Sequence, residues 1–255
     1  MSALISIITI NYNHLKGLQQ TFESIINQSD RSEIEWIIID GNSTDGSAEW
    51  LKDRESEFQQ LVIERDKGIY DAMNKGLKLA TGDYVWFLNS GDSLHSKNVL
   101  KDVCNTIRET QAEVIFGDTM FVDSEGKEIG LISKLKPQTL PEKLTNNSFR
   151  FGMNLCHQSF IAKKALCPWY DVHFRQAADV NWIIEILNRN PSNVRTPFVI
   201  ANFEVGGSSY QHTQKAWKER FAVLQKHYGF IPNILAHGWI VIRRIIFNIQ
   251  RKFAK

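Results

Sequence analysis

The sequence predicts an α/β protein with a mostly parallel central sheet and helices on both faces. In the first hundred residues, continuous apolar segments alternate with segments whose apolar residues recur every three or four positions. The apolar segments lack the alternation of a half-solvated sheet, so both faces of the sheet are expected to be buried. Each apolar segment ends in a polar cluster, and these clusters should meet at the carboxyl edge of the sheet, where ligands bind.

The predicted strands of this first half are short and apolar, and amphipathic helices separate them. Strands are expected over residues 4–10, 34–40, 61–66 and 83–89, and helices over residues 15–28, around Trp50, over residues 69–82 and after Ser96. Residues 3–10 have no positive flank and no small-residue cleavage site. We therefore interpret them as the first strand rather than a signal peptide.

From residue 112 the pattern changes, and a mixed second half is expected. Residues 112–130 predict two strands around an Asp-Ser-Glu-Gly turn, residues 131–150 a loop, residues 155–163 a strand and residues 179–189 a helix. No repeat or low-complexity linker interrupts the chain. The domain is therefore predicted to cover residues 1–209, in halves 1–110 and 111–209, with a basic amphipathic helical region over residues 210–255.

The composition is ordinary, but positive charge is concentrated at the C-terminus. The 255 residues are 43 % hydrophobic, with a net charge of +2, yet from Phe221 onward there are six Lys and Arg and no acidic residue. Such a tail suits an anionic partner, and no nucleic-acid partner is expected. The three cysteines lack a C-x-x-C spacing, which favours reduced thiols in a cytoplasmic protein. No uninterrupted run of 18 apolar residues is present, so no segment is expected to span a membrane by itself.

The segment "DGNSTDGS", residues 40–47, begins like a calcium-binding loop but departs from that pattern. Asp45 stands where the loop needs Gly, and Leu51 stands where it needs a bidentate Glu, so a calcium site is excluded. A polar turn between strand and helix is the simpler interpretation. However, Asp40 ends an apolar strand at the ligand edge, where a charge without a partner is costly.

Two further segments carry polar residues at the same edge. In "ERDKGIYDAMNKG", residues 64–76, Asn74 and Gly76 cost the helix on the order of 1 kcal/mol in propensity, and Gly76 is expected to permit close helix–sheet packing. The segment "YVWFLNSGDS", residues 84–93, runs from a buried strand to Asp92. Its polar end is either a tight turn or a carboxylate delivered to a metal ion.

These motifs together closely resemble glycosyltransferase family 2, whose members adopt the GT-A fold. The resemblance is carried by "SIITINYN", "DGNSTDGS", "DKGIYDAMNKG" and "GDYVWFLNSGD", and it weakens after residue 100 through "FGD", "HQSF", "YDVHFRQAADVNW" and "VGGSS". The form of "GIYDAMNKG" and "FLNSGD" is similar to bacterial exopolysaccharide enzymes of the colanic acid type. The resemblance implies inverting transfer of a sugar from a UDP- or GDP-sugar to a growing, lipid-linked surface glycan.

The resemblance also implies roles for individual residues. The nucleotide-sugar is expected to lie against Tyr12, Asn13, Asp40, Asp66, Lys67, Asn74 and Asn89. Asp92 is the expected ligand of Mg²⁺ or Mn²⁺, which neutralises a departing diphosphate. Asp179 is the expected general base for the acceptor hydroxyl. The acceptor side is expected to include His157, Gly206 and Gly207.

The chain departs from the family at its metal motif. Many relatives have Asp-Ser-Asp-Asp where this chain has Asn89-Ser90-Gly91-Asp92, so weak metal binding is expected without donor. Asp179 also has the simpler interpretation of a helix N-terminal residue, favoured there by the helix dipole. His157 lacks a partner at metal-ligand spacing, so it is either an internally bonded histidine or one that faces the acceptor.

Two other function classes and two placements of the C-terminal helix remain open at this point. A sugar nucleotidyltransferase would be expected to carry a Gly-rich, basic loop after the first strand, where this chain has "NYNHLKG". A non-catalytic nucleotide-sugar or glycan-binding module would not need the acidic residues that the metal motif of this chain lacks. The helix predicted in residues 238–255 either packs on its own domain or lies on the anionic inner face of the cell membrane.

Overall fold

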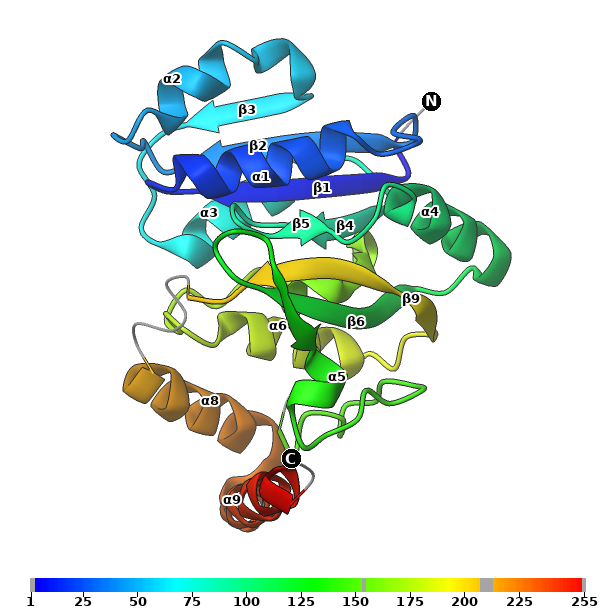
Figure 1. The fold of residues 1–255 in the computed structure, drawn as a ribbon, viewed down its shortest axis with the longest axis vertical. Coiled ribbons are helices and arrows are strands. Elements are labelled where there is room, and N and C mark those ends of the chain that lie inside the picture. The colour runs from blue at the N-terminus through cyan, green and yellow to red at the C-terminus, as the bar shows by residue number, and fades with distance from the viewer. Residues whose placement is uncertain (1–2, 153–154, 207–212, 254–255) are drawn as a thin grey trace.

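The computed structural model describes residues 3–152, 155–206 and 213–253, and its elements surround one mixed sheet (Figure 1). The strands pair in the order β3-β2-β1-β4-β8-β6-β9-β5, with β7 beside β6. Their bounds are β1 Ile5–Asn11, β2 Ile34–Asp40, β3 Gln60–Ile63, β4 Tyr84–Phe87, β5 Ser93–Leu94, β6 Val114–Val122, β7 Glu128–Leu131, β8 Phe160–Lys163 and β9 Asn193–Glu204. The α/β class expected from the alternating pattern is confirmed.

The first half of the sheet is parallel, as predicted. Strand β1 pairs in parallel with β2 and with β4, and β2 pairs in parallel with β3. In this register Asn11 lies opposite Asp40, so the polar ends of β1 and β2 meet at one edge. The predicted strand over residues 61–66 ends at Ile63, which leaves Asp66 in the connection to the next helix.

The second half is mixed, and it contains a long strand that the sequence did not reveal. Strand β9 runs parallel to β6, while β8 is antiparallel to both β4 and β6. The strand predicted over residues 155–163 is shorter than expected, because a 3₁₀ turn over His157–Ser159 precedes β8. The predicted loop at residues 131–150 contains one helical turn, α5 (Ile132–Leu135).

Helices cover both faces of the sheet and enclose two cores. One core contains Ile8, Ile10 and Phe87 with side chains of α3 (Ile69–Leu79) and α6 (Ala178–Leu187). The other contains Ile5 and Ile7 with side chains of α1 (Leu15–Ile26), α2 (Ser47–Lys52) and α4 (Val99–Thr110). Alternate residues of β1 thus enter opposite cores, which explains why its sequence is apolar at nearly every position.

Gly76 allows α3 to approach the sheet closely. A Cβ atom at this position would lie 2.3 Å from Cγ2 of Ile8, a fully buried residue of β1. Real Cβ contacts of that length do not occur, so only glycine fits here without movement. The close packing expected of Gly76 is confirmed.

Two helices, α8 (Thr213–Tyr228) and α9 (Phe230–Phe253), form the end of the molecule farthest from β3 (Figure 1). The amphipathic helix predicted from residue 238 therefore begins at Phe230 and is longer than expected. By length and composition, one helix in the described part of the chain, over Phe230–Gln250, is long and apolar enough to cross a membrane. The expectation that no segment could span a membrane by itself is therefore corrected for α9, which has the necessary length and composition.

Candidate functional site

The polar ends of β1, β2 and β4 form a hydrogen-bonded network at the carboxyl edge of the sheet. Asp40 is completely buried and accepts hydrogen bonds from Asn11 Nδ2 at 2.7 Å, from the Ser43 amide at 2.8 Å and from Ser43 Oγ at 2.7 Å. Ser90 Oγ in turn donates to Asn11 Oδ1 at 2.7 Å. The charge of Asp40 is thereby satisfied internally, and it holds the turns after β1, β2 and β4 together.

Asn13 fixes the turn that follows β1. It has a left-handed conformation with φ of 49°, and its amide donates to Ser43 Oγ at 2.8 Å. Its side-chain Oδ1 accepts from the Thr44 amide at 2.8 Å. These bonds set the direction of the chain on either side of Tyr12.

Tyr12 and Asp66 both lie close to Gly41, on the side where a side chain would project. A Cβ atom at Gly41 would lie 2.9 Å from Cδ2 of Tyr12 and 2.6 Å from Oδ2 of Asp66. Tyr12 is 66 % exposed, which is unusual for a large aromatic ring, and Asp66 accepts a hydrogen bond from the Gly68 amide at 2.8 Å. An exposed ring beside a carboxylate provides a face for stacking and an acceptor for a base N–H.

The segment between β3 and α3 brings positive charge to this edge. The Lys67 side chain is exposed, and its amide donates to Asp71 Oδ2 at 2.9 Å. Arg175, which precedes α6, donates to the Lys67 carbonyl. Sequence reasoning did not select Arg175, because nothing local places it beside a loop more than 100 positions away.

Asn74 has a positioning contact rather than an exposed amide. Its Nδ2 donates to the Tyr170 carbonyl at 3.0 Å, and its Oδ1 accepts from the Tyr170 amide at 2.8 Å. Both Nδ2 and Oδ1 of Asn74, a residue of α3, therefore bind the backbone of Tyr170 and hold that segment against the helix. This pairing accounts for a polar residue in the middle of that helix.

Asp92 is buried beside two residues from distant parts of the chain. It is 5 % exposed and accepts a hydrogen bond from Gln158 Nε2 at 2.8 Å. Burial raises the pKa of Asp92 to about 8, and the negative charge of Glu204 also raises it. Gly91, with φ of 94°, leaves the space into which Glu204 Oε2 projects, since a Cβ atom there would lie 2.7 Å from that oxygen.

The oxygen atoms around Gly91 suit a divalent cation. Among the described residues, Glu204 Oε2 and Asn89 Oδ1 are buried without a hydrogen-bond partner, although His14 Nε2 lies 3.9 Å from the former. No group of three or more His, Cys, Asp and Glu side chains in the described ranges is arranged to hold a metal. Two carboxylates and an amide oxygen nevertheless fit Mg²⁺ or Mn²⁺ when phosphate oxygens complete the shell.

Glu204 was not among the predicted site residues, although the segment that follows it was. It ends β9, a strand whose sequence contains Pro197, which weakens its strand signal. An acidic residue directly before "VGGSS" was the available clue.

Asp179 is half-buried in the first turn of α6, and Tyr70 orients its carboxylate. Tyr70 Oη donates to Asp179 Oδ1 at 3.1 Å, and burial together with the charge of Asp179 raises the pKa of Tyr70 well above 10. Across the described residues, no hydrogen bond reaches Asp179 Oδ2. A carboxylate with one oriented and one free oxygen is equipped to accept a proton.

His157 is an internally bonded histidine. It is 4 % exposed, its Nε2 lies 2.7 Å from Tyr170 Oη, and its ring packs on Phe87 and Trp182. Burial lowers the pKa of His157 to about 4, so its imidazole is neutral at physiological pH. This geometry corresponds to the first of the two interpretations given for it.

Cys156 is buried directly before the 3₁₀ turn that carries His157 and Gln158. Burial raises the pKa of its thiol to about 11, although the positive charge of Lys136 opposes this effect. Gly206 follows β9 with φ of 113°, and Gly207 lies outside the described residues.

Comparison with known proteins gives relatives of one kind. The model of the family "Glycosyl transferase family 2" matches residues 6–166. An uncharacterized glycosyltransferase of Mycobacterium tuberculosis is 30 % identical over 244 residues, which cover 92 % of this chain and 89 % of the relative. A PGL/p-HBAD biosynthesis glycosyltransferase of Mycobacterium bovis is 28 % identical over 246 residues, covering 92 % of this chain and 91 % of the relative.

Solved structures share the fold at low sequence identity. Residues 1–349 of S. aureus TarS align with a TM-score of 0.67 at 17 % identity, covering 89 % of this chain and 65 % of the TarS chain. The mannosyltransferase PcManGT from Pyrobaculum calidifontis, solved with GDP-Man and Mn²⁺, aligns with a TM-score of 0.60 at 15 % identity, covering 95 % of this chain and 74 % of the other. The expected GT-A fold is confirmed.

Proposed function

This chain belongs to glycosyltransferase family 2, and we propose that it transfers a sugar from a UDP- or GDP-linked donor to a glycan acceptor with inversion at the anomeric carbon. The donor class is supported by TarS, solved with UDP-GlcNAc, and by PcManGT, solved with GDP-Man. The observation that carries the proposal is Asp179, half-buried in the first turn of α6 with its Oδ1 held by Tyr70 Oη at 3.1 Å.

The proposed catalytic residue is Asp179. Its free Oδ2 accepts the proton of the acceptor hydroxyl as that hydroxyl attacks the anomeric carbon, while Tyr70 keeps the carboxylate in place. A single displacement inverts the anomeric centre. Double displacement with retention would need a second, nucleophilic carboxylate close to the first.

The proposed donor site lies at the carboxyl edge. The base stacks on Tyr12 beside Asp66, and Asn13 and Asp40 hold the turns that frame it. The exposed Lys67, between β3 and α3, is the residue proposed to face the diphosphate. Asp92 and Glu204 would hold Mg²⁺ or Mn²⁺, and the ion would supply positive charge to the departing diphosphate.

The proposed acceptor is a growing, lipid-linked bacterial glycan, handled at the cytoplasmic face of the membrane. The support for this placement is α9, whose exposed residues are largely apolar and whose charged residues are basic. A helix of this kind lies along an anionic membrane surface with its apolar face toward the lipid. The adjacent Arg243 and Arg244 near its middle favour this arrangement over a membrane span, because each costs several kcal/mol at the bilayer centre.

The test is donor turnover by wild-type protein and two matched carboxylate variants. Asp179→Asn is expected to keep its affinity for the nucleotide and to lose transfer by about 10²-fold or more. Asp171→Asn is the control, because Asp171 lies in the same segment but pairs with the exposed His173. Near-normal transfer by Asp179→Asn would refute the assignment of the base.

The same assay separates the proposed function from its two rivals. Nucleotide-sugar formation from a nucleoside triphosphate and a sugar phosphate would identify a nucleotidyltransferase. Donor binding without transfer or hydrolysis would identify a binding module. Asp92→Asn is expected to abolish the stabilisation that Mn²⁺ adds to the nucleotide complex in thermal unfolding.

A further inference from the structure

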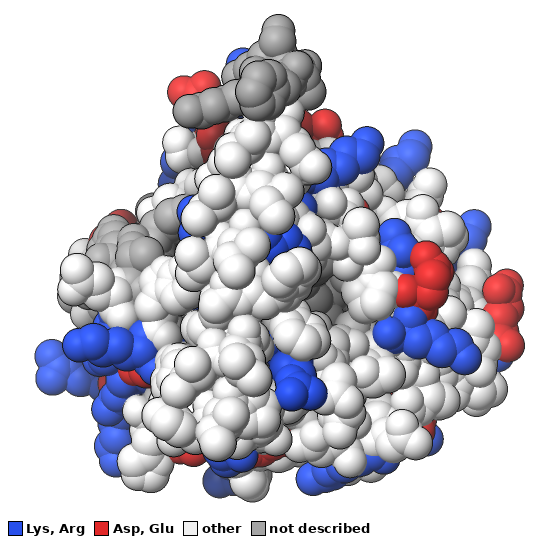
Figure 2. All heavy atoms as spheres, turned by 90° about the horizontal axis from the view of Figure 1, so that it is seen from below, with Lys and Arg blue, Asp and Glu red and all other residues white. Residues whose placement is uncertain are grey.

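The outer surface of α9 is apolar, and no element of the described part of the chain covers it. Ten of its large apolar residues are each at least 44 % exposed: Phe230, Ile231, Ile234, Leu235, Trp239, Val241, Ile242, Ile245, Ile246 and Ile249. Figure 2 shows this end of the molecule as a broad uncharged surface with Lys and Arg around it. A lipid bilayer with negatively charged headgroups is complementary to such a surface, because its interior is apolar and its headgroups attract Lys and Arg.

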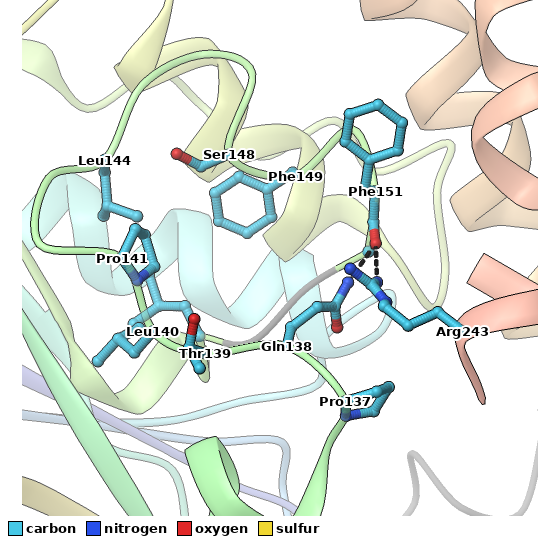
Figure 3. Close-up of a pocket in the computed structure, with 12 residues that line it drawn as sticks. Pro137, Gln138, Thr139, Leu140, Pro141, Leu144, Ser148, Phe149, Phe151 and Arg243 are labelled. Carbon is cyan, nitrogen blue, oxygen red and sulfur yellow. Dashed lines mark hydrogen bonds between the residues drawn. The ribbon is translucent and has the colours of Figure 1, made fainter. Parts of the chain in front are cut away.

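A pocket opens beside this surface, between α9 and residues 137–152 (Figure 3). Its walls include Leu140, Leu144, Phe149, Phe151 and Gly152, and α9 contributes Arg243. We name it the Phe151–Arg243 pocket. Its volume is about 300 Å³, which is at the lower limit of small-molecule sites and so accommodates part of a larger ligand.

One corner of the Phe151–Arg243 pocket is polar. Arg243 Nη2 and Gln138 Nε2 both donate to the Phe151 carbonyl, as the dashed lines in Figure 3 show. Gly152, with φ of 101°, leaves room for Gln138, because a Cβ atom there would lie 2.3 Å from its Nε2. Two donors therefore converge on one carbonyl oxygen at the end of an otherwise apolar wall.

Arg243 is the only charged residue among the described residues that line the pocket. Arg243 Nε and Arg150 Nε are buried, and neither has a hydrogen-bond partner among the described residues. The Arg150 guanidinium carbon lies 5.7 Å from the centre of the Phe151 ring, so both arginines flank that residue. Burial lowers the pKa of Arg243, which agrees with an environment that lacks a counter-charge. Within the described residues, only Nη2 of the Arg243 guanidinium has a hydrogen-bond partner, so this group can donate further hydrogen bonds to a phosphate, whose oxygens accept several.

We propose that the Phe151–Arg243 pocket binds the phosphate and the first part of the hydrocarbon chain of a membrane lipid, drawn from the bilayer on which α9 lies. The apolar wall takes the chain, and Arg243 takes the phosphate.

This inference rests on the proposed function in one respect: that the bound lipid is the one that anchors the glycan acceptor. The pocket itself is tested without any sugar donor. Farnesyl phosphate is a suitable probe, because it combines a short isoprenoid chain with a phosphate and dissolves below its micelle concentration. Inorganic phosphate and farnesol are its two halves.

The decisive experiment is calorimetric titration of the full chain with these three probes. Wild-type protein is expected to bind farnesyl phosphate at one site, and to bind either half at least about tenfold more weakly. Arg243→Met keeps the apolar stem and removes the donors, and is expected to weaken binding at least about tenfold. Arg244→Met, an equal change of charge at the exposed neighbouring residue, is expected to stay within about twofold.

Several outcomes would overturn the proposal. Equal affinity for inorganic phosphate and farnesyl phosphate would indicate a site for free phosphate, and unchanged binding by Arg243→Met would remove the pocket. Concentration-dependent dimerisation that α9 substitutions abolish would mean that a second copy covers the helix. Circular dichroism and UDP binding in Arg243→Met separate a local loss from unfolding. Arg243-dependent binding in a protein without transfer activity would support the pocket and refute the proposed function alone.

Discussion

Replacing Gly76 by alanine should destabilise the protein, although alanine is the better helix former. The added Cβ would lie 2.3 Å from Cγ2 and 3.5 Å from Cβ of Ile8, and 3.5 Å from Cγ1 of Ile39. Ile8 and Ile39 are fully buried residues of β1 and β2, so they have no free space into which to turn. Relief of the contact requires α3 to move away from the sheet.

The magnitude follows from two opposing terms. Overpacking a well-packed core costs about 1–3 kcal/mol, and replacing Gly by Ala inside a helix returns about 1 kcal/mol. The net loss is then up to about 2 kcal/mol, which for a chain of this size lowers the melting temperature by at most about 4–8 °C. Transfer activity should fall as well, because α3 carries Tyr70 and Asn74, which position Asp179 and Tyr170.

Thermal unfolding followed by circular dichroism measures this effect, with Gly238→Ala as the matched control. Gly238 lies inside α9, and a Cβ atom there would meet no atom within 4 Å. The control should unfold at the wild-type temperature or slightly above it. A Gly76→Ala variant as stable as the control would refute the argument that close packing selects glycine at this position.

Three further predictions concern single side chains. Tyr12→Ala should weaken UDP or GDP binding by about 1–3 kcal/mol in a calorimetric titration, and Tyr12→Phe should retain it, because the exposed ring offers stacking area. Burial would raise the pKa of Glu35, but hydrogen bonds from Ser6, Thr81 and Gly82 lower it below its usual 4.5. Ionised Glu35 therefore stabilises the fold above that pH, and this stabilisation is lost as the pH falls. Glu35→Gln should cost about 1–3 kcal/mol at pH 7 and flatten the acid side of the stability curve measured by urea unfolding. Burial raises the pKa of the Cys104 and Cys156 thiols to about 11 and that of Cys167 to about 12. Ellman's reagent at pH 8 should therefore react slowly with the folded chain and quickly after unfolding.

The parts of the fold that were predictable from sequence are those with a local signal. Strands β1 and β2 are continuous apolar segments, and α3 has apolar residues at helical spacing, so their identity and order were predicted correctly. Strand β9 contains Pro197 and several polar residues, and its partner β6 lies about 80 positions earlier. Pairing with that distant strand stabilises β9, and no short window of sequence records such a partner.

The same distinction applies to the candidate site. Tyr12, Asp40 and Asp92 were placed at the ligand edge because they follow strands, which are local features, and the family resemblance supplied their roles. Gln158 and Glu204 were missed, because they reach Asp92 only after β8 joins the sheet beside β4 and β9 joins it beside β6. The 3₁₀ turn at His157–Ser159, which replaces the expected strand, is what turns Gln158 toward Asp92.

The buried polar atoms without hydrogen-bond partners differ between the two ends of the molecule: most at one end are acceptors, and most at the other are donors. Within the described residues, the unpaired oxygens Asn89 Oδ1 and Glu204 Oε2 lie at the carboxyl edge, and the unpaired Nε atoms of Arg150 and Arg243 lie beside α9. Asn233 Oδ1, where α9 packs on α8, is the exception to this pattern. Unpaired buried groups are costly, so they are expected mainly where a ligand supplies the missing partner. Acceptors at one end require a cation or N–H donors, as a metal–nucleotide complex provides, and donors at the other end require an anion. A protein that joins a nucleotide-linked sugar to a lipid-linked glycan needs these two kinds of site, and it needs them at separate places so that both substrates are bound when the sugar is transferred.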